Sequence, residues 1–331
     1  MRSPPSEQPL KAASKCSMPE ILNPLIHIGY HKTGTNWLQI HVWPNNNLGL
    51  TKFPKKDVHD FFVHPRPFEW SAKLTREFFE PRVKANAERG LLSVISSERL
   101  SGNPHSGGYD SKEILERLFA TFPNARVFMS LREQRSMVNS AYTQYVRSGG
   151  PGTVDQFLLP PEEGARRVPL FDFQHFAYHW LIQHYFARFG KDNVLALPYE
   201  LFVKEPKQYV RRILEFAMVP IDEDRLDALP FTRRENAGLS GANIMLRRPL
   251  NYLFVHDRNN ALAPFPMKNG SKFVRETCLV LEKAVPKKLS KSLESMRKKR
   301  VVELVGDRYK ESNAITSQLI GIDLREYGYQ M

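Results

Sequence analysis

The sequence predicts an α/β fold in which a central parallel sheet is flanked by helices. Short apolar, β-branched segments alternate along the chain with longer segments of helical periodicity, and a glycine-containing loop joins the first of these strands to a helix. Strands that are separated by helices need crossover connections, so they pair in parallel and are buried on both faces. With 41% hydrophobic and 25% charged residues, the chain of 331 residues has enough apolar material for such a core.

The first predicted strand is the apolar segment 25–30, which leads through a tight turn into a helix near Trp37. Residues 1–20 are rich in Pro, Ser and Lys and are predicted to form a flexible tail. Because the sequence shows no internal repeat and no long linker, residues 21–331 are predicted to form a single domain, with a largely helical C-terminal third from about Phe231. The other predicted strands are 91–95, 125–131 and 193–197, and the predicted helices are 111–122, 134–147, 171–189 and 206–217.

The charge balance favours anionic partners. The sequence holds 48 Lys and Arg against 35 Asp and Glu, a net charge of +13, which suits nucleic acid, a membrane surface, a nucleotide or an anionic polymer. No segment approaches the ~18 to 20 apolar residues of a membrane-spanning helix, and no apolar signal core follows Arg2, so the predicted location is cytoplasmic. Cys16 and Cys278 are too few for a disulfide framework and have no ligands at zinc-site spacing.

The loop at residues 29–37 has the composition of an anion-binding site. It follows a strand of the predicted parallel sheet and opens a helix, which is where phosphate groups bind to exposed backbone amides. Gly34 allows close approach of the backbone, threonine hydroxyls donate hydrogen bonds, and Lys32 supplies a positive charge. The lysine precedes the last glycine, whereas in nucleotide triphosphatases it follows that glycine and precedes Ser or Thr.

This loop resembles the 5′-phosphosulfate loop of the sulfotransferases that use 3′-phosphoadenosine 5′-phosphosulfate (PAPS), whose usual form is Lys-Ser/Thr-Gly-Thr-Thr/Ser. Asn36 stands where that family most often has Thr or Ser. The resemblance implies a P-loop NTPase-like sulfotransferase fold, PAPS as co-substrate and PAP as product. It also implies a cofactor site that contains His31, Lys32, Thr33, Gly34, Thr35, Asn36 and Trp37.

A second segment, residues 125–140, resembles the family's 3′-phosphate segment. There an Arg ends a strand, and a Ser eight residues later faces the same phosphate, as Arg132 and Ser140 do in type and spacing. A guanidinium grips a phosphate with two parallel hydrogen bonds, which suits this role. Arg135 is interpreted as a solvated or structural charge.

Two weaker similarities extend the resemblance over about residues 25–330. Residues 194–201 resemble the family's strand that ends in Tyr-Glu-Asp, which implies that Tyr199 lies beside the adenosine, although Leu201 replaces the Asp. Residues 308–313 and 322–329 resemble the C-terminal end of bacterial members. The predicted reaction is transfer of the sulfuryl group of PAPS to a hydroxyl of a carbohydrate, glycolipid or small metabolite.

In such a reaction Lys32 stabilises the leaving phosphate, and a base takes the proton of the acceptor hydroxyl. The family's small-molecule branch uses a His after the next strand, and its carbohydrate-acting branch often has a Glu there. Glu98 follows the strand 91–95 and is the first candidate for the base; His105, in the loop beyond it, is the second. No cluster of carboxylates or histidines at ligand spacing predicts a metal site.

Other charged and histidine-rich segments have less specific interpretations. His175, His179 and His184 fall among aromatic residues on one predicted helix; the first two are spaced as zinc ligands can be, but packing in the core or in a substrate channel is favoured. The basic segment 283–300 predicts a solvated helix face, or a docking surface for an anionic polysaccharide or lipid headgroup at the membrane periphery.

Two other classes of function compete with sulfuryl transfer. A nucleotide kinase or NTPase needs Lys followed by Ser or Thr after the last loop glycine and a magnesium-binding Asp at the end of a strand, and the sequence has neither. A nucleic-acid-binding protein would use the positive charge, but the sequence has no helix-turn-helix, zinc-finger or aromatic sheet signature. We therefore expect no nucleic-acid partner.

Overall fold

The computed structural model of the chain describes residues 23–160, 170–233, 238–257 and 260–331. At its centre lies a five-stranded sheet in the order β2-β3-β1-β4-β5, and every pair of neighbouring strands is parallel. This confirms the predicted α/β fold. The predicted tail, residues 1–20, lies outside the described residues. The strands are β1 (Leu25–His27), β2 (Leu50–Lys52), β3 (Leu92–Ser96), β4 (Arg126–Leu131) and β5 (Val194–Pro198).

The first strand is shorter than predicted, and one strand at the sheet edge was not predicted. β1 ends at His27, although the chain stays beside β4: the N–H of Ile28 donates to the carbonyl of Phe128 (3.0 Å) and that of Tyr30 to Ser130 (3.3 Å). The added strand, β2, has three residues and pairs with β3. A strand of this length is too short to show a sequence pattern.

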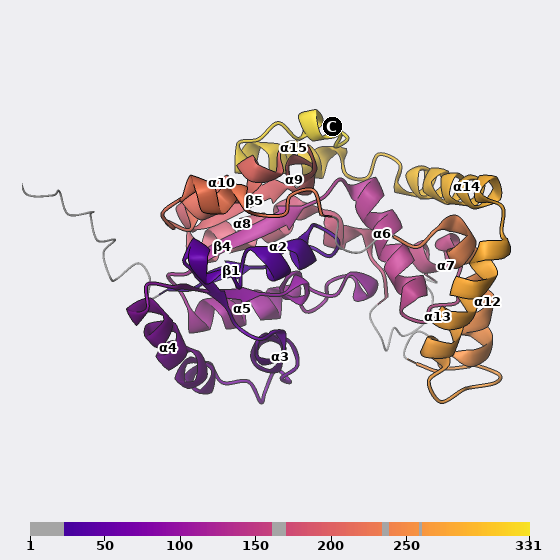
Figure 1. Cartoon of the computed structure of the whole chain (residues 1–331), viewed down its shortest axis with the longest axis horizontal. Coiled ribbons are helices and arrows are strands. Elements are labelled where there is room, and N and C mark those ends of the chain that lie inside the picture. Colours follow the sequence, from indigo (N-terminus) through magenta and orange to yellow (C-terminus); the bar gives the residue numbers. More distant parts are fainter. Residues whose placement is uncertain (1–22, 161–169, 234–237, 258–259) are drawn as a thin grey trace, which may run out of the picture.

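Helices cover both faces of the sheet (Figure 1). Val127 and Met129 of β4 pack in one apolar cluster with α4, α5 and α8, whereas Phe128 between them packs in another with α2 and α10. Burial on both faces explains why the strands read as continuous apolar segments. The helices of these two layers are α2 (Thr35–His41), α4 (Ala72–Glu88), α5 (Ser111–Thr121), α8 (Tyr178–Phe189) and α10 (Pro206–Phe216).

The chain after residue 240 is helical. Helix α12 packs on α13 and α14, and both α12 and α14 pack against α6, at the end of the molecule that lies away from the sheet in Figure 1. Helix α15 returns to pack on α8. Within the described ranges, no helix is long and apolar enough to cross a membrane. The bounds are α6 (Gln134–Arg147), α12 (Gly241–Phe254), α13 (Gly270–Leu281), α14 (Lys287–Val305) and α15 (Lys310–Ile320).

The predicted helix 171–189 is divided in the structure. A 3-10 turn, η5 (Phe173–Phe176), precedes α8, and Ala177 between them is not helical. Helices also fill much of the segment between β2 and β3. The shorter elements are η1 (Asn46–Leu48), α3 (Lys55–Val58), η2 (His59–Val63), η3 (Glu98–Ser101), η4 (Pro104–Ser106), α7 (Val154–Leu158), η6 (Lys191–Asn193), α9 (Tyr199–Lys204), α11 (Glu223–Asp227), η7 (Glu282–Ala284) and η8 (Leu324–Tyr327).

Candidate active site

The predicted anion loop joins β1 to α2 at the carboxyl edge of the sheet. Two of its residues have left-handed backbone conformations, Lys32 with φ 65° and Gly34 with φ 80°. A β-carbon on Gly34 would lie 3.3 Å from ring atoms of both Tyr199 and Phe202. Gly34 is therefore required for its backbone conformation and for the close approach of the segment after β5.

The threonines and the tryptophan of the loop fix its shape from within. The buried Thr33 donates its hydroxyl to the carbonyl of Tyr30 at 2.5 Å and lies 3.4 Å, oxygen to oxygen, from the hydroxyl of Thr35. Trp37 is buried and packs on two phenylalanine rings, with centroids 5.0 and 5.5 Å away. Asn36 is exposed on α2. The residue that departs from the family pattern thus lies where the fold does not constrain it.

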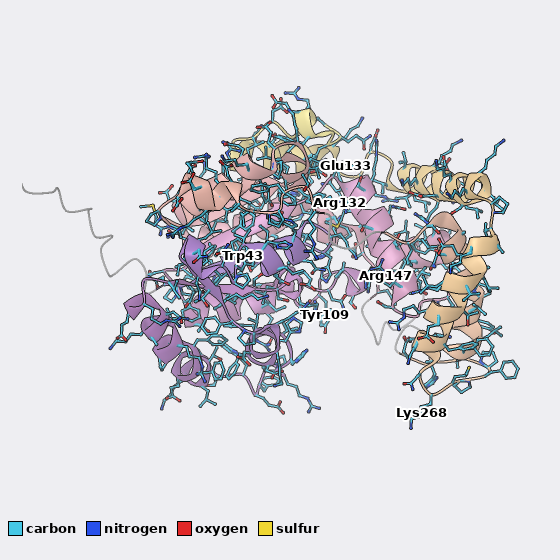
Figure 2. The ribbon with its side chains drawn as sticks, viewed as in Figure 1. Trp43, Tyr109, Arg132, Glu133, Arg147 and Lys268 are labelled. Atoms are coloured by element: carbon cyan, nitrogen blue, oxygen red, sulfur yellow. The ribbon has the colours of Figure 1, made fainter. Side chains whose placement is uncertain are left out.

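His27 ends β1, just before the loop, and belongs to no sequence motif that would mark it as a site residue. The buried indole N–H of Trp43 (labelled in Figure 2) donates to His27 Nδ1 at 3.1 Å, so the proton of the neutral ring resides on Nε2. Burial lowers the pKa of His27 to about 3. A β-carbon on Gly29 would lie 2.7 Å from Nε2, so this position in the loop accepts only glycine while His27 is present.

Arg132 follows β4 and joins the two predicted phosphate-binding segments. Its guanidinium donates to the carbonyl of Lys32 at 2.9 Å and lies 5.3 Å from the centre of the Tyr199 ring. The hydroxyl of Tyr178 in turn donates to the carbonyl of Arg132 at 2.5 Å. The structure therefore brings Lys32, Arg132 and Tyr199 together, as the resemblance implies, from three separate parts of the chain.

A hydrogen-bond network of two carboxylates, Glu133 and Glu200, stabilises the segment that follows Arg132. The side chain of Glu133 (Figure 2) accepts hydrogen bonds from two backbone amides of the first turn of α6, and its own N–H donates to Glu200 Oε1 at 3.0 Å. The hydroxyl of Tyr329 donates to Glu200 Oε2 at 3.2 Å. Burial raises the pKa of Glu200, against the opposing effects of these hydrogen bonds and of Arg132. The two weaker similarities in the sequence thus meet at one carboxylate.

Helix α6 carries Ser140, a predicted ligand of the 3′-phosphate, and Arg147. Ser140 and Arg147 lie seven residues apart, on the same face of α6. Among the described residues, the hydroxyl of Ser140 makes no hydrogen bond. Arg147 affects Lys32 through its charge. Burial, followed by the charges of Arg147 and Arg132, lowers the pKa of the Lys32 ammonium. Arg147 belongs to no sequence motif, so only the three-dimensional structure shows that its charge acts on Lys32.

Glu98 opens the turn η3 directly after β3, beside helix α3. Lys55 donates to its Oε1 at 2.5 Å, while Oε2 is buried and has no hydrogen-bond partner within the described part of the chain. Burial acts to raise the pKa of Glu98, but the hydrogen bond and charge of Lys55 outweigh it, so the pKa lies below its usual range. Glu98 is therefore an anion near neutral pH, with one oxygen anchored by Lys55.

His105 lies in η4 and is half-buried beside the aromatic side chains of Tyr145 and Phe157. Its Nε2 is 3.3 Å from the carbonyl of Ala141, which can only accept, so Nε2 carries the proton and Nδ1 keeps a free lone pair. Burial, reinforced by the charges of Arg99 and Lys32, lowers the pKa of His105. His105 is therefore neutral at physiological pH and lies within electrostatic reach of Lys32.

Three more polar side chains surround this region: His31, Arg99 and His175. Arg99 donates through one terminal nitrogen to Asp110 at 2.5 Å. Its other terminal nitrogen, His31 Nδ1 and His175 Nε2 are buried without hydrogen-bond partners in the described structure. Burial lowers the pKa of both histidines, that of His175 to about 4, and the nearby charge of Arg99 lowers them further.

The three histidines of the aromatic segment have different surroundings. His175 belongs to η5 and packs beside Tyr30, with ring centres 5.2 Å apart, whereas His179 of α8 bonds to the hydroxyl of Ser312 at 2.8 Å. His175 and His179 therefore do not lie on one helix at the spacing of zinc ligands, because η5 ends before α8 begins. Residues 23–160, 170–233, 238–257 and 260–331 contain no group of three potential metal ligands. His184 bonds to the carbonyl of Trp180 within α8 at 2.9 Å.

A model of the sulfotransferase family matches residues 112–223, which include Arg132, Ser140 and Tyr199. The structure of a sulfotransferase from Alicyclobacillus acidocaldarius aligns with 92% of this chain and 98% of its own, at 18% identity and a TM-score of 0.52.

Two more distant structures are also similar. The sulfotransferase domain of the curacin biosynthetic pathway aligns with 77% of this chain and 96% of its own (15% identity, TM-score 0.41). Mouse sulfotransferase SULT7A1, in complex with PAP, aligns with 83% of this chain and 88% of its own (13% identity, TM-score 0.36). A comparison with curated proteins gave no match. The sulfotransferase family model thus matches the segment around β4, residues 112–223 of the 331, and the Alicyclobacillus enzyme shares the fold of this chain.

Proposed function

We propose that the protein transfers the sulfuryl group of PAPS to a hydroxyl of a carbohydrate, glycolipid or small metabolite and releases PAP. The observation that carries the proposal is the convergence of Lys32, Arg132 and Tyr199 at one edge of the sheet. A PAPS molecule offers a phosphosulfate to the anion loop, a 3′-phosphate to Arg132 and Ser140, and an adenosine to Tyr199. No metal takes part in the proposed reaction.

The proposed step is an in-line displacement. The acceptor oxygen bonds to sulfur as the bond between sulfur and the 5′-phosphate oxygen breaks, and the proton of the hydroxyl passes to a base. Lys32 neutralises the charge that develops on the departing phosphate. Burial and then the charges of Arg147 and Arg132 lower the pKa of Lys32, and this concentration of positive charge suits a site that receives a highly charged anion.

Two groups are proposed as the base, and their surroundings differ. His105 combines a neutral ring with a free lone pair on Nδ1, and this combination supports it as the proton acceptor. Glu98 is ionised, but Lys55 occupies one of its oxygens and lowers its pKa, which weakens it as a base. In this scheme Glu98 with Lys55 orients the acceptor, unless the variants described below assign it the proton.

The proposed acceptor class rests on the polar groups that surround these two candidates. A terminal nitrogen of Arg99, His31 Nδ1, His175 Nε2 and Glu98 Oε2 are buried without hydrogen-bond partners among the described residues. Buried polar groups without partners cost free energy, and an acceptor with several hydroxyls, or with an acidic group for Arg99, can supply partners once side chains adjust around it. The cytoplasmic location stays a prediction from the sequence.

The experiment that tests the proposal is a transfer assay with sulfur-labelled PAPS over a panel of acidic and neutral polysaccharides, glycolipids and phenols. We expect label to appear in a sulfate ester of at least one acceptor, with one PAP formed for each ester. Lys32→Ala protein serves as the control for background hydrolysis. Absence of transfer to every acceptor, together with failure of PAP to raise the melting temperature of the protein, would refute PAPS dependence.

A further inference from the structure

We propose that the helical segment 241–305 docks the protein on an anionic lipid surface. This segment, which we name the helical arm, contains α12, α13 and α14, on the side of the molecule away from the sheet (Figure 1). Its 65 residues hold 14 Lys and Arg but only five Asp and Glu. The arm therefore carries a net charge of +9 out of +13 for the whole chain, and this inference is independent of the proposed reaction.

Exposed apolar side chains gather on the same arm. Twelve of the 21 large hydrophobic side chains that are exposed in the described structure belong to it. A soluble surface normally carries such side chains singly, and their concentration in one region marks a site of interaction. Positive charge and exposed apolar groups on one element are the combination that binds at the interface of an anionic membrane.

The loop between α12 and α13 forms the apolar tip of the arm. Leu262 is 84% exposed and Phe265 is 64% exposed, and Lys268, which follows them in the sequence, lies at the end of the arm in Figure 2. The loop is fixed to the end of α12, because the N–H of Phe265 donates to Leu253 O (2.9 Å) and that of Met267 to Phe254 O (3.1 Å). A fixed loop can insert its apolar side chains without a large loss of conformational entropy.

Helix α13 extends this surface from the tip. It buries Val274 and Cys278 against the end of α12, whereas Phe273, Leu279 and Val280 remain exposed, at 39%, 54% and 67%. Lys272 and Arg275 are exposed on the same helix. The stems of such long cationic side chains can lie along apolar lipid while their charged ends stay at the headgroups.

Charge and apolarity together select a membrane over the other possible partners. A second copy bound through the same face would place +9 against +9, which opposes a symmetric dimer. A soluble polyanion would pair with the lysines but leave Leu262 and Phe265 in water. An anionic bilayer offers phosphate headgroups to the lysines and acyl chains to the apolar tip.

Sedimentation of the full chain with vesicles tests this inference. We expect binding to vesicles of equimolar phosphatidylcholine and phosphatidylglycerol, and little binding to phosphatidylcholine alone. The double variant Leu262→Ser, Phe265→Ser should weaken binding to the anionic vesicles at least about tenfold, because it removes the inserted apolar groups. Lys268→Glu with Lys272→Glu should weaken it as well, and added salt should reduce the binding of the wild type.

Phe68→Ser is the matched control, since Phe68 is fully exposed but lies outside the arm, between β2 and β3. It should bind vesicles like the wild type, and all variants should keep the melting temperature of the wild type because the changed side chains are exposed. The inference is overturned if the wild type does not bind anionic vesicles at low salt. It is also overturned if the apolar variant binds them unchanged while heparin binding depends on the lysines, or if the apolar variant instead abolishes a dimer.

Discussion

The two sides of the proposed active site are built differently. On the donor side, formed by the anion loop, Arg132, Tyr199 and Glu200, side chains bond to one another and to backbone carbonyls and amides. On the acceptor side, formed by Glu98, Arg99, His105 and His175, polar atoms are buried without partners in the described structure. Apart from His31, whose Nδ1 has no partner among the described residues, the donor side thus has its geometry before any ligand binds, whereas the acceptor side is incomplete without one.

This difference follows from the ligands that the two sides are proposed to hold. A cofactor is the same in every turnover, so a site fixed by backbone and by short charged side chains serves it well. An acceptor brings its own hydroxyls, and groups that wait for partners can recognise it. If the interpretation is right, changes on the donor side should affect cofactor binding and chemistry together, whereas changes on the acceptor side should affect turnover alone.

The largest effect is expected for Lys32→Ala. Removal of a charge aimed at a developing anion should lower kcat by roughly a thousandfold, or about 4 kcal/mol. The measurement is the initial rate of labelled transfer at saturating acceptor. Lys73→Ala is a suitable control, because Lys73 lies on the exposed surface of α4 and pairs with Glu77 at 3.8 Å. A Lys32→Ala rate within about threefold of the wild type would remove Lys32 from the reaction.

The second effect separates the two candidate bases on the acceptor side. The variant that removes the true base should lower kcat at least about a hundredfold while the affinity for PAPS stays nearly unchanged. His105→Gln preserves an N–H donor for the carbonyl of Ala141, and Glu98→Gln preserves the shape of the side chain beside Lys55. We expect His105→Gln to show the loss. If only Glu98→Gln shows it, the carboxylate is the base; if neither does, the acceptor side is only a binding surface.

Prediction from sequence succeeded where local pattern and position coincide. The parallel sheet follows from apolar segments separated by helices, and the proximity of Lys32 and Arg132 follows because neighbouring parallel strands end at the same edge. Their roles in binding PAPS stay a prediction. On the acceptor side, Glu98 and His105 are candidates from the sequence, but the residues around them could not be predicted in the same way. Arg147, His27 and Arg99 belong to no motif and reach the site only through tertiary packing. The strand β2 and the helices before β3 lack a pattern strong enough to read.

A smaller effect is expected for the nucleotide preference of the donor side. Adenosine 3′,5′-bisphosphate should raise the melting temperature of the wild type more than AMP does, because Arg132 and Ser140 are proposed to hold the 3′-phosphate. At a hundred times its Kd a ligand stabilises by about 2.7 kcal/mol, which is several degrees in melting temperature. Arg132→Ala should erase the difference, and Arg135→Ala should keep it. Equal shifts with both nucleotides in the wild type would contradict the assignment of the 3′-phosphate site.

The smallest expected effect is that of mild acid on the rate, and it sharpens the choice of base. A base must be unprotonated to act, and burial with the charges of Arg99 and Lys32 lowers the pKa of His105 below its usual value of 6.5. The rate should therefore stay constant from neutral pH down to about 6.5 and fall only below that value. If Glu98 is the base, its lowered pKa moves the fall to still lower pH.

Stability must be followed in parallel, because the pKa values of His27 and His175 are lowered to about 3 and 4 in the folded protein. Between those values and 6.5 the unfolded chain binds more protons than the folded one, so the free energy of unfolding decreases as the pH falls. Circular dichroism at each pH distinguishes this loss of folded protein from protonation of the base. A rate that declines already between pH 8 and 7 in fully folded protein would exclude a base with a lowered pKa.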